Sequence, residues 1–290
     1  MTVAWIGLGA MGLPMARRLA TGGHDVVGYD VAADRAGEGI TPATSPAAAA
    51  AGADAVFVMV ADADQARAAL SGDDGVLVAL RPGATVVVCS TIGPAAMAEL
   101  ADAIRAAGGK PVDAPVSGGT ARAATGELLV MAGAAPDDLA AVRDLLETLA
   151  AQVVPAGDRP GDGQRLKLVN QLLCGVHIAV AAEALAFARA LGLDPALCHE
   201  ALGQGAAASF MFADRGARMA AESFTDVRSA VDIFVKDMGL VADAAAGAGF
   251  DAELAAHAHR RFQLAHDAGF GRLDDSSVIR TYLDQAGYTE

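Results

Sequence analysis

The segment GDGQRLKLVNQLL, residues 161–173, places a lysine and an asparagine three positions apart in a predicted helix. Because residues i and i+3 lie on the same side of a helix, Lys167 and Asn170 point in one direction. A lysine removed from water can exchange a proton near neutral pH, since burial lowers its pKa from about 10.4. Lys167 is therefore a candidate acid–base group and Asn170 a candidate ligand. The alternative is that Lys167 extends from the first helical turn into solvent and does no chemistry.

Two other segments carry side chains that could act with this pair. DAPVSGGT predicts a strand that ends in a turn, which would expose the Ser117 hydroxyl and the backbone amides of Gly118 and Gly119. These groups are suited to binding a carboxylate, although a plain glycine turn would have the same sequence. VDIFVKDMGL places Lys236 and Asp237 in an otherwise apolar helix. The alternative there is a surface salt bridge, which would contribute little to stability.

A phosphate-binding loop is predicted near the N-terminus. The hexamer GLGAMG follows an apolar strand and opens a helix, so its glycines would allow a tight turn against a pyrophosphate at a helix N-terminus. A second predicted strand ends in Asp30, 18 residues after the last glycine, where an acid would bind the ribose hydroxyls. The alternative is a glycine turn that binds no nucleotide. The residues of the hexamer are Gly7, Leu8, Gly9, Ala10, Met11 and Gly12.

The identity of the nucleotide follows from the charge beside the ribose. An aspartate at position 30 would repel the 2′-phosphate of NADP, so we expect NAD in preference to NADP. Arg35, five residues further on, favours the opposite outcome.

The elements that must position these residues alternate in the first half of the chain. Short β-branched runs such as TVAWIGL, DVVGYD, AVFVMV and ATVVVCS are separated by Ala-rich helical stretches. This alternation is typical of βαβ units and predicts an α/β, doubly wound Rossmann domain with its sheet covered on both faces. PDDLAAVRDLLETLA, residues 136–150, is expected to form one helix.

After Gly161 the strand patterns stop, and a second, all-α domain is expected to begin with a long interdomain helix. A chain of 290 residues favours two domains, because single cores stop growing near ~250 residues. We place a dinucleotide-binding domain at 1–160 and a helical substrate and oligomerisation domain at 161–290. Because a domain of about 130 residues would not cover so apolar a helix, we expect a homodimer or homotetramer.

Charge and cysteine content restrict the class of partner. The net charge of −14 argues against nucleic acid and against anchoring to an anionic membrane. The long helix contains too many polar residues to span a bilayer without partners, and the N-terminus lacks the pattern of a signal peptide, so a cytoplasmic protein is expected. The cysteines at 89, 174 and 198 and the histidines show no metal-ligand spacing, so no metal site is expected.

Five motifs in this order carry a resemblance that extends over essentially the whole chain: GLGAMGLPMARRL, STIGP, DAPVSGG, GQRLKLVNQ and FVKDMGL. The chain resembles the β-hydroxyacid dehydrogenase family, which includes 3-hydroxyisobutyrate dehydrogenase and tartronate semialdehyde reductase. NQLLCGVHIAVAAEALAFA, SFMFADR, SAVDIFVKDMGLVADAA and DDSSVI look like the branch that contains L-threonate dehydrogenase, which oxidises four-carbon acid sugars at C2. L-threo-3-phenylserine dehydrogenase is another relative of this branch.

The resemblance implies an NAD-dependent enzyme that moves a hydride between a small hydroxy acid and the coenzyme. It implies that Lys167 is catalytic, that Asn170 binds substrate, and that Ser117 with the two glycines after it holds the substrate carboxylate. It also implies a set of residues that line the coenzyme, with the last reaching it from the helical domain: Val60, Ala61, Thr91 and Lys236. Many family members have Leu-Pro where this chain has Val60-Ala61.

Several alternatives remain at this point. The substrate could be 3-hydroxyisobutyrate, tartronate semialdehyde or phenylserine in place of a four-carbon acid sugar. An imine reductase shares the fold, but such proteins typically replace the lysine. An NAD-sensing protein without catalytic activity is the alternative from another class, and the presence of Lys167, Asn170 and Ser117 argues against it.

Overall fold

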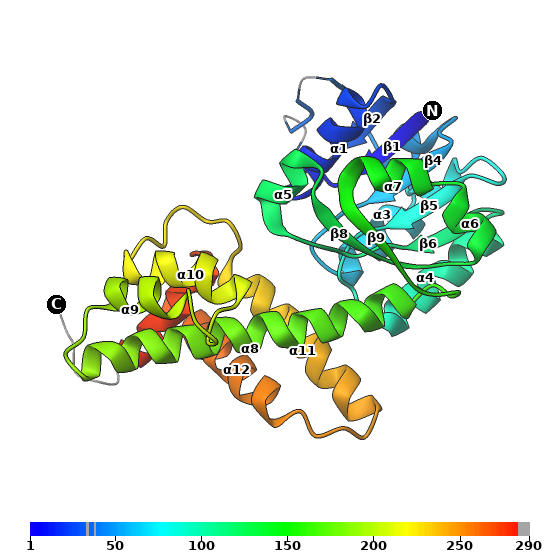
Figure 1. Cartoon of the computed structure of the whole chain (residues 1–290). Coiled ribbons are helices and arrows are strands. Elements are labelled where there is room, and N and C mark those ends of the chain that lie inside the picture. Colours follow the sequence, from blue (N-terminus) through cyan, green and yellow to red (C-terminus); the bar gives the residue numbers. More distant parts are fainter. Residues whose placement is uncertain (33–34, 38, 284–290) are drawn as a thin grey trace. The chain divides into compact units, whose positions relative to one another are not determined.

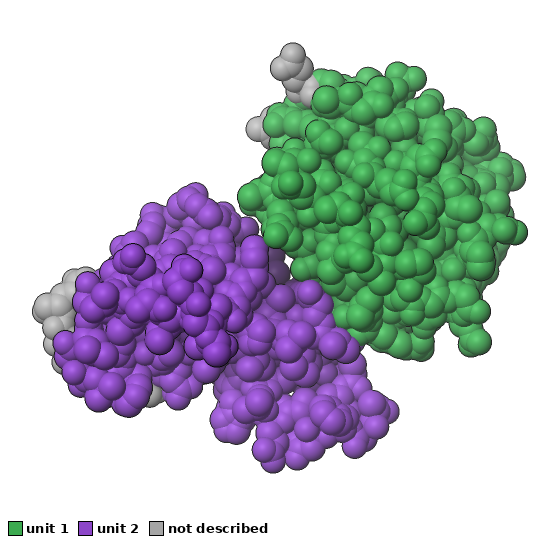
Figure 2. All heavy atoms as spheres, viewed as in Figure 1, with its two compact units in different colours: residues 1–167 green, residues 168–290 purple. Residues whose placement is uncertain are grey.

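The structure of the chain, a computed structural model, describes residues 1–32, 35–37 and 39–283. The chain divides into two compact units, Met1–Lys167 and Leu168–Glu290 (Figure 2). The expected boundary between residues 160 and 161 stays a prediction.

The described part of the first unit holds one nine-stranded sheet in the order β3-β2-β1-β4-β5-β6-β8-β7, with β9 paired to β8. Neighbouring strands from β3 to β6 are parallel, whereas β8 runs antiparallel to β6 and β7. The predicted Rossmann fold is confirmed. The strands are β1 Thr2–Ile6, β2 Asp25–Tyr29, β3 Ile40–Pro42, β4 Ala55–Val58, β5 Thr85–Val88, β6 Lys110–Asp113, β7 Val116–Ser117, β8 Leu128–Gly133 and β9 Ala150–Gly157.

Helices cover both faces of this sheet (Figure 1). Alternate residues of a strand point to opposite faces, so Trp5 stacks on Phe57 at 5.1 Å on one side while Ile6 and Val58 belong to the core on the other. The first face packs against α1 Gly12–Thr21, α5 Gly119–Thr125, α6 Pro136–Ala140 and α7 Arg143–Leu149. The second packs against α2 Pro46–Ala50, α3 Ala63–Ser71 and α4 Pro94–Ala106, with a 3-10 turn at Val76–Val78.

The prediction of a single helix over residues 136–150 is wrong. Two short helices, α6 and α7, occupy this segment, and Val142 between them has φ −120° and ψ 8°, outside the helical region. Leu139 and Val142 are both buried in the same core as Leu145 and Leu146. This apolar spacing is also that of one continuous helix face, so the pattern alone does not show the break at Val142.

The second unit is helical, as predicted. Phe234 stacks on Phe262 at 5.1 Å, and these rings share a core with Ile178 and Met238. Two helices begin with side-chain caps, since Asp194 accepts the backbone N–H of Ala196 and Ser209 accepts that of Phe212. Its elements are the greater part of α8 Asp162–Ala190, then α9 Pro195–Leu202, α10 Phe210–Ala220, α11 Val231–Gly247, α12 Glu253–Ala265, a π turn His266–Phe270, a 3-10 helix Asp275–Ile279 and α13 Arg280–Leu283.

A buried ion-pair network joins α10 to the DDSSVI segment. Arg218 Nε lies 2.9 Å from Asp274 Oδ1, and Arg215 pairs with Asp275 at 3.0 Å. Both aspartates are fully buried, and such pairs are tolerated only when each charge has a partner. Two of the segments that carry the resemblance, SFMFADR and DDSSVI, therefore contact each other within the second unit.

Helix α8 is long and apolar enough to cross a membrane by length and composition, with half of its most apolar window buried. It also buries three polar side chains, Gln164, Lys167 and Gln171, at 0, 6 and 5 % exposure. Two of these bond to aspartates of other elements. Buried polar pairs of this kind are typical of a core helix in a folded domain, as the sequence predicted.

Candidate active site

The glycine-rich loop follows β1, the strand at which the order of strands in the sheet reverses. β1 is paired with β2 on one side and β4 on the other, and the helices that follow β1 and β4, α1 and α3, cover opposite faces of the sheet. Open α/β sheets bind ligands at such a point. Gly7 has φ +94°, and a Cβ there would lie 2.2 Å from the Met59 carbonyl oxygen. A Cβ on Gly12 would lie 1.9 Å from the Gly7 carbonyl oxygen. Only glycine fits at these two positions.

Gly9 differs from its two neighbours in the motif. Among the described residues, a Cβ at this position would meet only Arg35 Nη1, at 3.8 Å. The backbone around Gly9 is therefore open to the close approach of another group, while Gly7 and Gly12 hold the loop against β4 and α1. A loop that is tight at its ends and open at its centre fits a dinucleotide pyrophosphate at the start of α1.

Asp30 follows β2 and is bound to the same loop. Its Oδ2 accepts the backbone N–H of Leu8 at 2.7 Å, and its Oδ1 accepts that of Ala32 at 2.9 Å. Arg35 lies 3.5 Å from Oδ1, with half of its side chain exposed. The carboxylate thus fixes the loop to the end of β2, and a contact with ribose stays a prediction.

The other predicted coenzyme residues of the first unit lie at the same edge of the sheet. Val60 follows β4 and donates its backbone N–H to Ser90 Oγ at 2.8 Å, and the Ala61 N–H bonds to Gln65. Thr91 comes directly after Ser90, past the end of β5. The structure therefore brings these residues to the edge that carries the glycine-rich loop.

The segment predicted to hold the substrate carboxylate, Ser117 to Gly119, forms a turn after β7. Ser117 ends β7, which pairs with β8, and its side chain is half-buried. Gly118 and Gly119 follow with φ +139° and +73°, conformations that favour glycine. The turn predicted from SGG is present, whereas the exposure of the Ser117 hydroxyl and the role of the turn in binding stay predictions.

The start of α8 is fixed to β6 by Asp113, which is fully buried. Its Oδ2 accepts the backbone N–H groups of Gly161 at 2.9 Å and Gln164 at 2.8 Å, and its Oδ1 accepts Gln164 Nε2 at 2.7 Å. Burial raises the pKa of Asp113 to about 6, against the opposing effect of these hydrogen bonds.

Gln164 extends this attachment to the segment after β5. Its Oε1 accepts the backbone N–H groups of Ile92 at 2.9 Å and Gly93 at 3.0 Å, and its Nε2 also donates to the Ser90 carbonyl at 3.0 Å. Sequence reasoning did not select Asp113 or Gln164 as site residues. The available signal was a glutamine three residues before Lys167, on the same face of an apolar helix.

Lys167 lies one helical turn after Gln164 and is 6 % exposed. The alternative in which it extends into solvent is therefore wrong.

Asn170 and Lys236 belong to the second unit. Asn170 Nδ2 donates to Gln171 Oε1 at 2.8 Å, and Gln171 Nε2 donates to Asp237 Oδ2 at 2.5 Å. Lys236 Nζ lies 3.0 Å from Asp237 Oδ1. The salt bridge weighed from the sequence is therefore present, but the Asp237 side chain is 4 % exposed, so the pair is not a surface one. The polar residues of α8 and the ion pair of α11 thus form one network, from Asn170 through Gln171 and Asp237 to Lys236.

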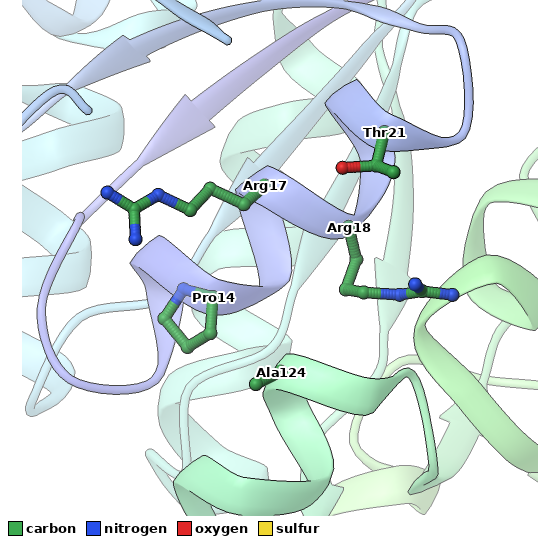
Figure 3. Close-up of a pocket in the computed structure, with 5 residues that line it drawn as sticks. All are labelled: Pro14, Arg17, Arg18, Thr21 and Ala124. Atoms are coloured by element: carbon green, nitrogen blue, oxygen red, sulfur yellow. The ribbon is translucent and has the colours of Figure 1, made fainter. Parts of the chain in front are cut away.

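A hollow on the first unit lies apart from these residues, between α1 and α5 (Figure 3). Pro14, Arg17, Arg18, Thr21 and Ala124 line it, and the two guanidinium groups point away from each other in Figure 3. They therefore do not converge on a common anion. Among the residues that the structure describes, no group of three His, Cys, Asp or Glu side chains could hold a metal ion.

Comparison with known proteins identifies the family. The family described as the NAD binding domain of 6-phosphogluconate dehydrogenase matches residues 2–157, and the one described as NAD-binding of NADP-dependent 3-hydroxyisobutyrate dehydrogenase matches 161–282. The chain belongs to the 3-hydroxyisobutyrate dehydrogenase-like (β-hydroxyacid dehydrogenase) family. The resemblance drawn from the five motifs is confirmed.

Individual relatives agree with this assignment over nearly their full length. The L-threonate dehydrogenase of Cupriavidus necator is 38 % identical, over 96 % of this chain and 94 % of its own. The crystal structure of a 3-hydroxyisobutyrate dehydrogenase from Salmonella typhimurium superposes with TM-score 0.91 at 39 % identity, covering 97 % of this chain and 99 % of that one. The Mycobacterium tuberculosis 3-hydroxyisobutyrate dehydrogenase with L-serine gives 0.84 at 30 % identity, covering 97 % and 98 %.

This family member is an NAD(P)-dependent oxidoreductase of the hydroxy acid dehydrogenase type, as predicted.

Proposed function

We propose that this chain oxidises the C2 hydroxyl of L-threonate with NAD as the acceptor. The L-threonate dehydrogenases among its relatives, at 36–38 % identity, support this substrate. The observation that carries the chemistry is the burial of Lys167, one turn into a helix whose start is bonded to the nucleotide-binding sheet. A buried lysine can act as a base because burial disfavours its ammonium form.

Each predicted site residue has a separate role in the proposed reaction. Lys167 removes the proton of the substrate hydroxyl, and Asn170 orients that hydroxyl or the lysine. Ser117 and the backbone amides of Gly118 and Gly119 hold the substrate carboxylate. The nicotinamide, when bound, supplies the hydride acceptor. The loop from Gly7 to Gly12 holds the pyrophosphate, Asp30 the ribose, and Val60, Ala61, Thr91 and Lys236 contribute further coenzyme contacts.

The substrate is tested by mixing the purified protein with NAD and L-threonate and following NADH formation. We expect kcat/KM for L-threonate to exceed that for 3-hydroxyisobutyrate and phenylserine by tenfold or more, because a site that hydrogen-bonds the additional hydroxyls of L-threonate rejects substrates without them, by up to ~10⁴-fold. The enantiomer D-threonate, whose hydroxyls point in other directions, should also react more slowly. Higher kcat/KM for any other acid would reassign the substrate.

The reverse direction, NADH with tartronate semialdehyde, tests the remaining family substrate. No turnover with any acid, together with measurable NAD binding, would favour the NAD-sensing alternative. Reduction of a cyclic imine would favour an imine reductase, which Lys167 argues against.

A homodimer or homotetramer in the cytoplasm completes the proposal. Leu173, Val180 and Phe187 on α8 are 50, 53 and 62 % exposed, and they recur every seven residues. An apolar stripe with this repeat favours packing against another helix, and a second copy of the chain would supply one. Light scattering should therefore give at least twice the monomer mass of 29.0 kDa. A monomer that stays fully active would contradict this part of the proposal.

A further inference from the structure

We propose that Asp113 and Gln164 are positioning residues, which hold Lys167 in a fixed place relative to the segment that carries Thr91. The inference rests on the proposed function, since it takes Lys167 as the proton-transfer group and Thr91 as a coenzyme contact. Neither residue needs to touch substrate, because both act through the start of α8.

The hydrogen bonds of Gln164 leave its amide only one orientation. Ile92 and Gly93 present backbone N–H groups, so the atom that faces them at 2.9 and 3.0 Å must be the acceptor Oε1. The other atom is then Nε2, which donates to the Ser90 carbonyl and to Asp113. The amide thus binds both sides of Thr91, at residues 90, 92 and 93, while its own backbone lies one turn before Lys167.

The ionised carboxylate of Asp113 completes this arrangement. All three groups that face it are N–H donors, two from the backbone at Gly161 and Gln164 and one from the Gln164 side chain. A proton on Oδ1 would face Nε2–H, and Gln164 cannot turn over to accept it without opposing Ile92 and Gly93. The other titratable groups that act on Asp113 are Cys89, directly after β5, and Asp162 of α8.

The backbone at this point leaves little room for adjustment. A Cβ on Gly163 would lie 2.3 Å from the Met131 carbonyl oxygen and 2.9 Å from Asp113 Oδ2. The first turn of α8 therefore runs directly against β8 and Asp113. Loss of the Asp113–Gln164 pair would let this turn shift, and displacement of a reacting group by ~1 Å can reduce turnover by about 100-fold.

The test compares the single variants Asp113→Asn, Gln164→Met and Gln164→Glu with the double variant Asp113→Asn/Gln164→Glu. In Asp113→Asn the side-chain oxygen still accepts the two backbone N–H groups, so the new NH₂ group faces Gln164 Nε2, which is also a donor. Gln164→Met removes all four hydrogen bonds of the Gln164 side chain. In the double variant one oxygen of the new glutamate accepts from the new asparagine. Its other oxygen still accepts from Ile92 and Gly93, so one mismatch remains, at the Ser90 carbonyl.

Each single variant should lose about 10- to 100-fold in kcat, because the first turn of α8 is released. We expect the double variant to recover several-fold over Gln164→Glu alone. A double variant no better than Gln164→Glu would contradict the pairing of the two side chains.

Three readouts separate positioning from general loss of stability. NADH binding by fluorescence should change less than kcat. In Asp113→Asn the acidic limb of the kcat–pH profile should lose its component near pH 6 and keep the component that comes from protonation of Lys167. Leu70→Ala is the matched control, because Leu70 is fully buried in α3 on the same unit. At a temperature where the control and the variants are equally folded, the control should keep wild-type kcat.

Failure of this inference and failure of the proposed function give different results. If Lys167→Met abolishes turnover while Asp113→Asn and Gln164→Met match Leu70→Ala in kcat and pH profile, the positioning role is overturned. If Lys167→Met keeps turnover, the proposed function is overturned first.

Discussion

Gln171 Nε2 donates to Asp237 Oδ2 at 2.5 Å, which joins α8 to α11 within the helical unit. Asp237 also forms an ion pair with Lys236, so its buried carboxylate faces one hydrogen-bond donor and one cation. In Asp237→Asn one donor would face the new amide, and an unmet buried polar group costs about 1–3 kcal/mol. We expect urea unfolding to show a loss of this size. Asp243→Asn is the control on the same helix, where the exposed side chain predicts no change.

Replacement of Lys167 with Met should remove turnover and leave coenzyme binding intact. General acid–base groups typically contribute 10²- to 10⁴-fold, so we expect kcat to fall by about that factor. Met preserves the length of the side chain in its buried site, which limits the structural effect. Turnover is measured with L-threonate and binding with NADH fluorescence. The matched control is Lys110→Met, since Lys110 is a half-exposed lysine that pairs with Asp138. Equal losses in both variants would contradict the role of Lys167.

Gly163→Ala should destabilise the first unit, because the new Cβ would lie 2.3 Å from the Met131 carbonyl oxygen. The backbone of β8 would have to move, and strain of this kind in a packed site typically costs about 1–3 kcal/mol. Thermal unfolding measures the effect. Gly247→Ala, where the new Cβ would meet no other part of the described chain within 4 Å apart from its own helix, should leave the melting temperature unchanged or raise it slightly.

The stability of the protein should depend on the ionisation of Asp113. Its pKa is raised to about 6 in the folded chain, chiefly by burial, whereas an unfolded aspartate titrates near ~3.9. Between these values the folded state binds the additional proton, so its contribution to the free energy of unfolding decreases as pH rises from about 4 to 6 and is constant above that. Over this window the difference in unfolding free energy between wild type and Asp113→Asn should fall by about 2–3 kcal/mol. A difference that stays flat or rises would contradict the assignment.

The coenzyme preference should depend on Asp30. We expect NAD to be favoured in the wild type, and Asp30→Asn to shift the ratio of kcat/KM values toward NADP by about tenfold, equivalent to ~1.4 kcal/mol, because the charge opposing a 2′-phosphate is removed. Arg35→Ala should shift the ratio in the opposite direction, since Arg35 lies 3.5 Å from the same carboxylate. The exposed Asp25 at the start of β2 provides the control as Asp25→Asn. A wild-type preference for NADP would overturn the prediction.

Local sequence patterns were sufficient for the fold class and for the position of the nucleotide loop. Short β-branched runs that alternate with Ala-rich helical stretches predicted the strands. The spacing of Gly7, Gly9 and Gly12 predicted the turn after the first strand. These features depend on periodicity and on backbone conformation, which neighbouring residues decide. β9 was not predicted, because its outer residues are partly exposed and its pairing with β8 comes from a distant segment.

Contacts between residues far apart in the chain were decided only by the tertiary structure. The sequence by itself determined that Lys167 lies on an apolar helix after a glycine-rich crossing. It did not determine that Gln164 would bond to Asp113, 51 residues away, or to the backbone at Ile92 and Gly93. A glutamine offers both a donor and an acceptor, and its partners are chosen by whichever groups the packed sheet leaves buried beside it. Hydrogen-bond complementarity of this kind exists only after β5, β6 and α8 have been brought together.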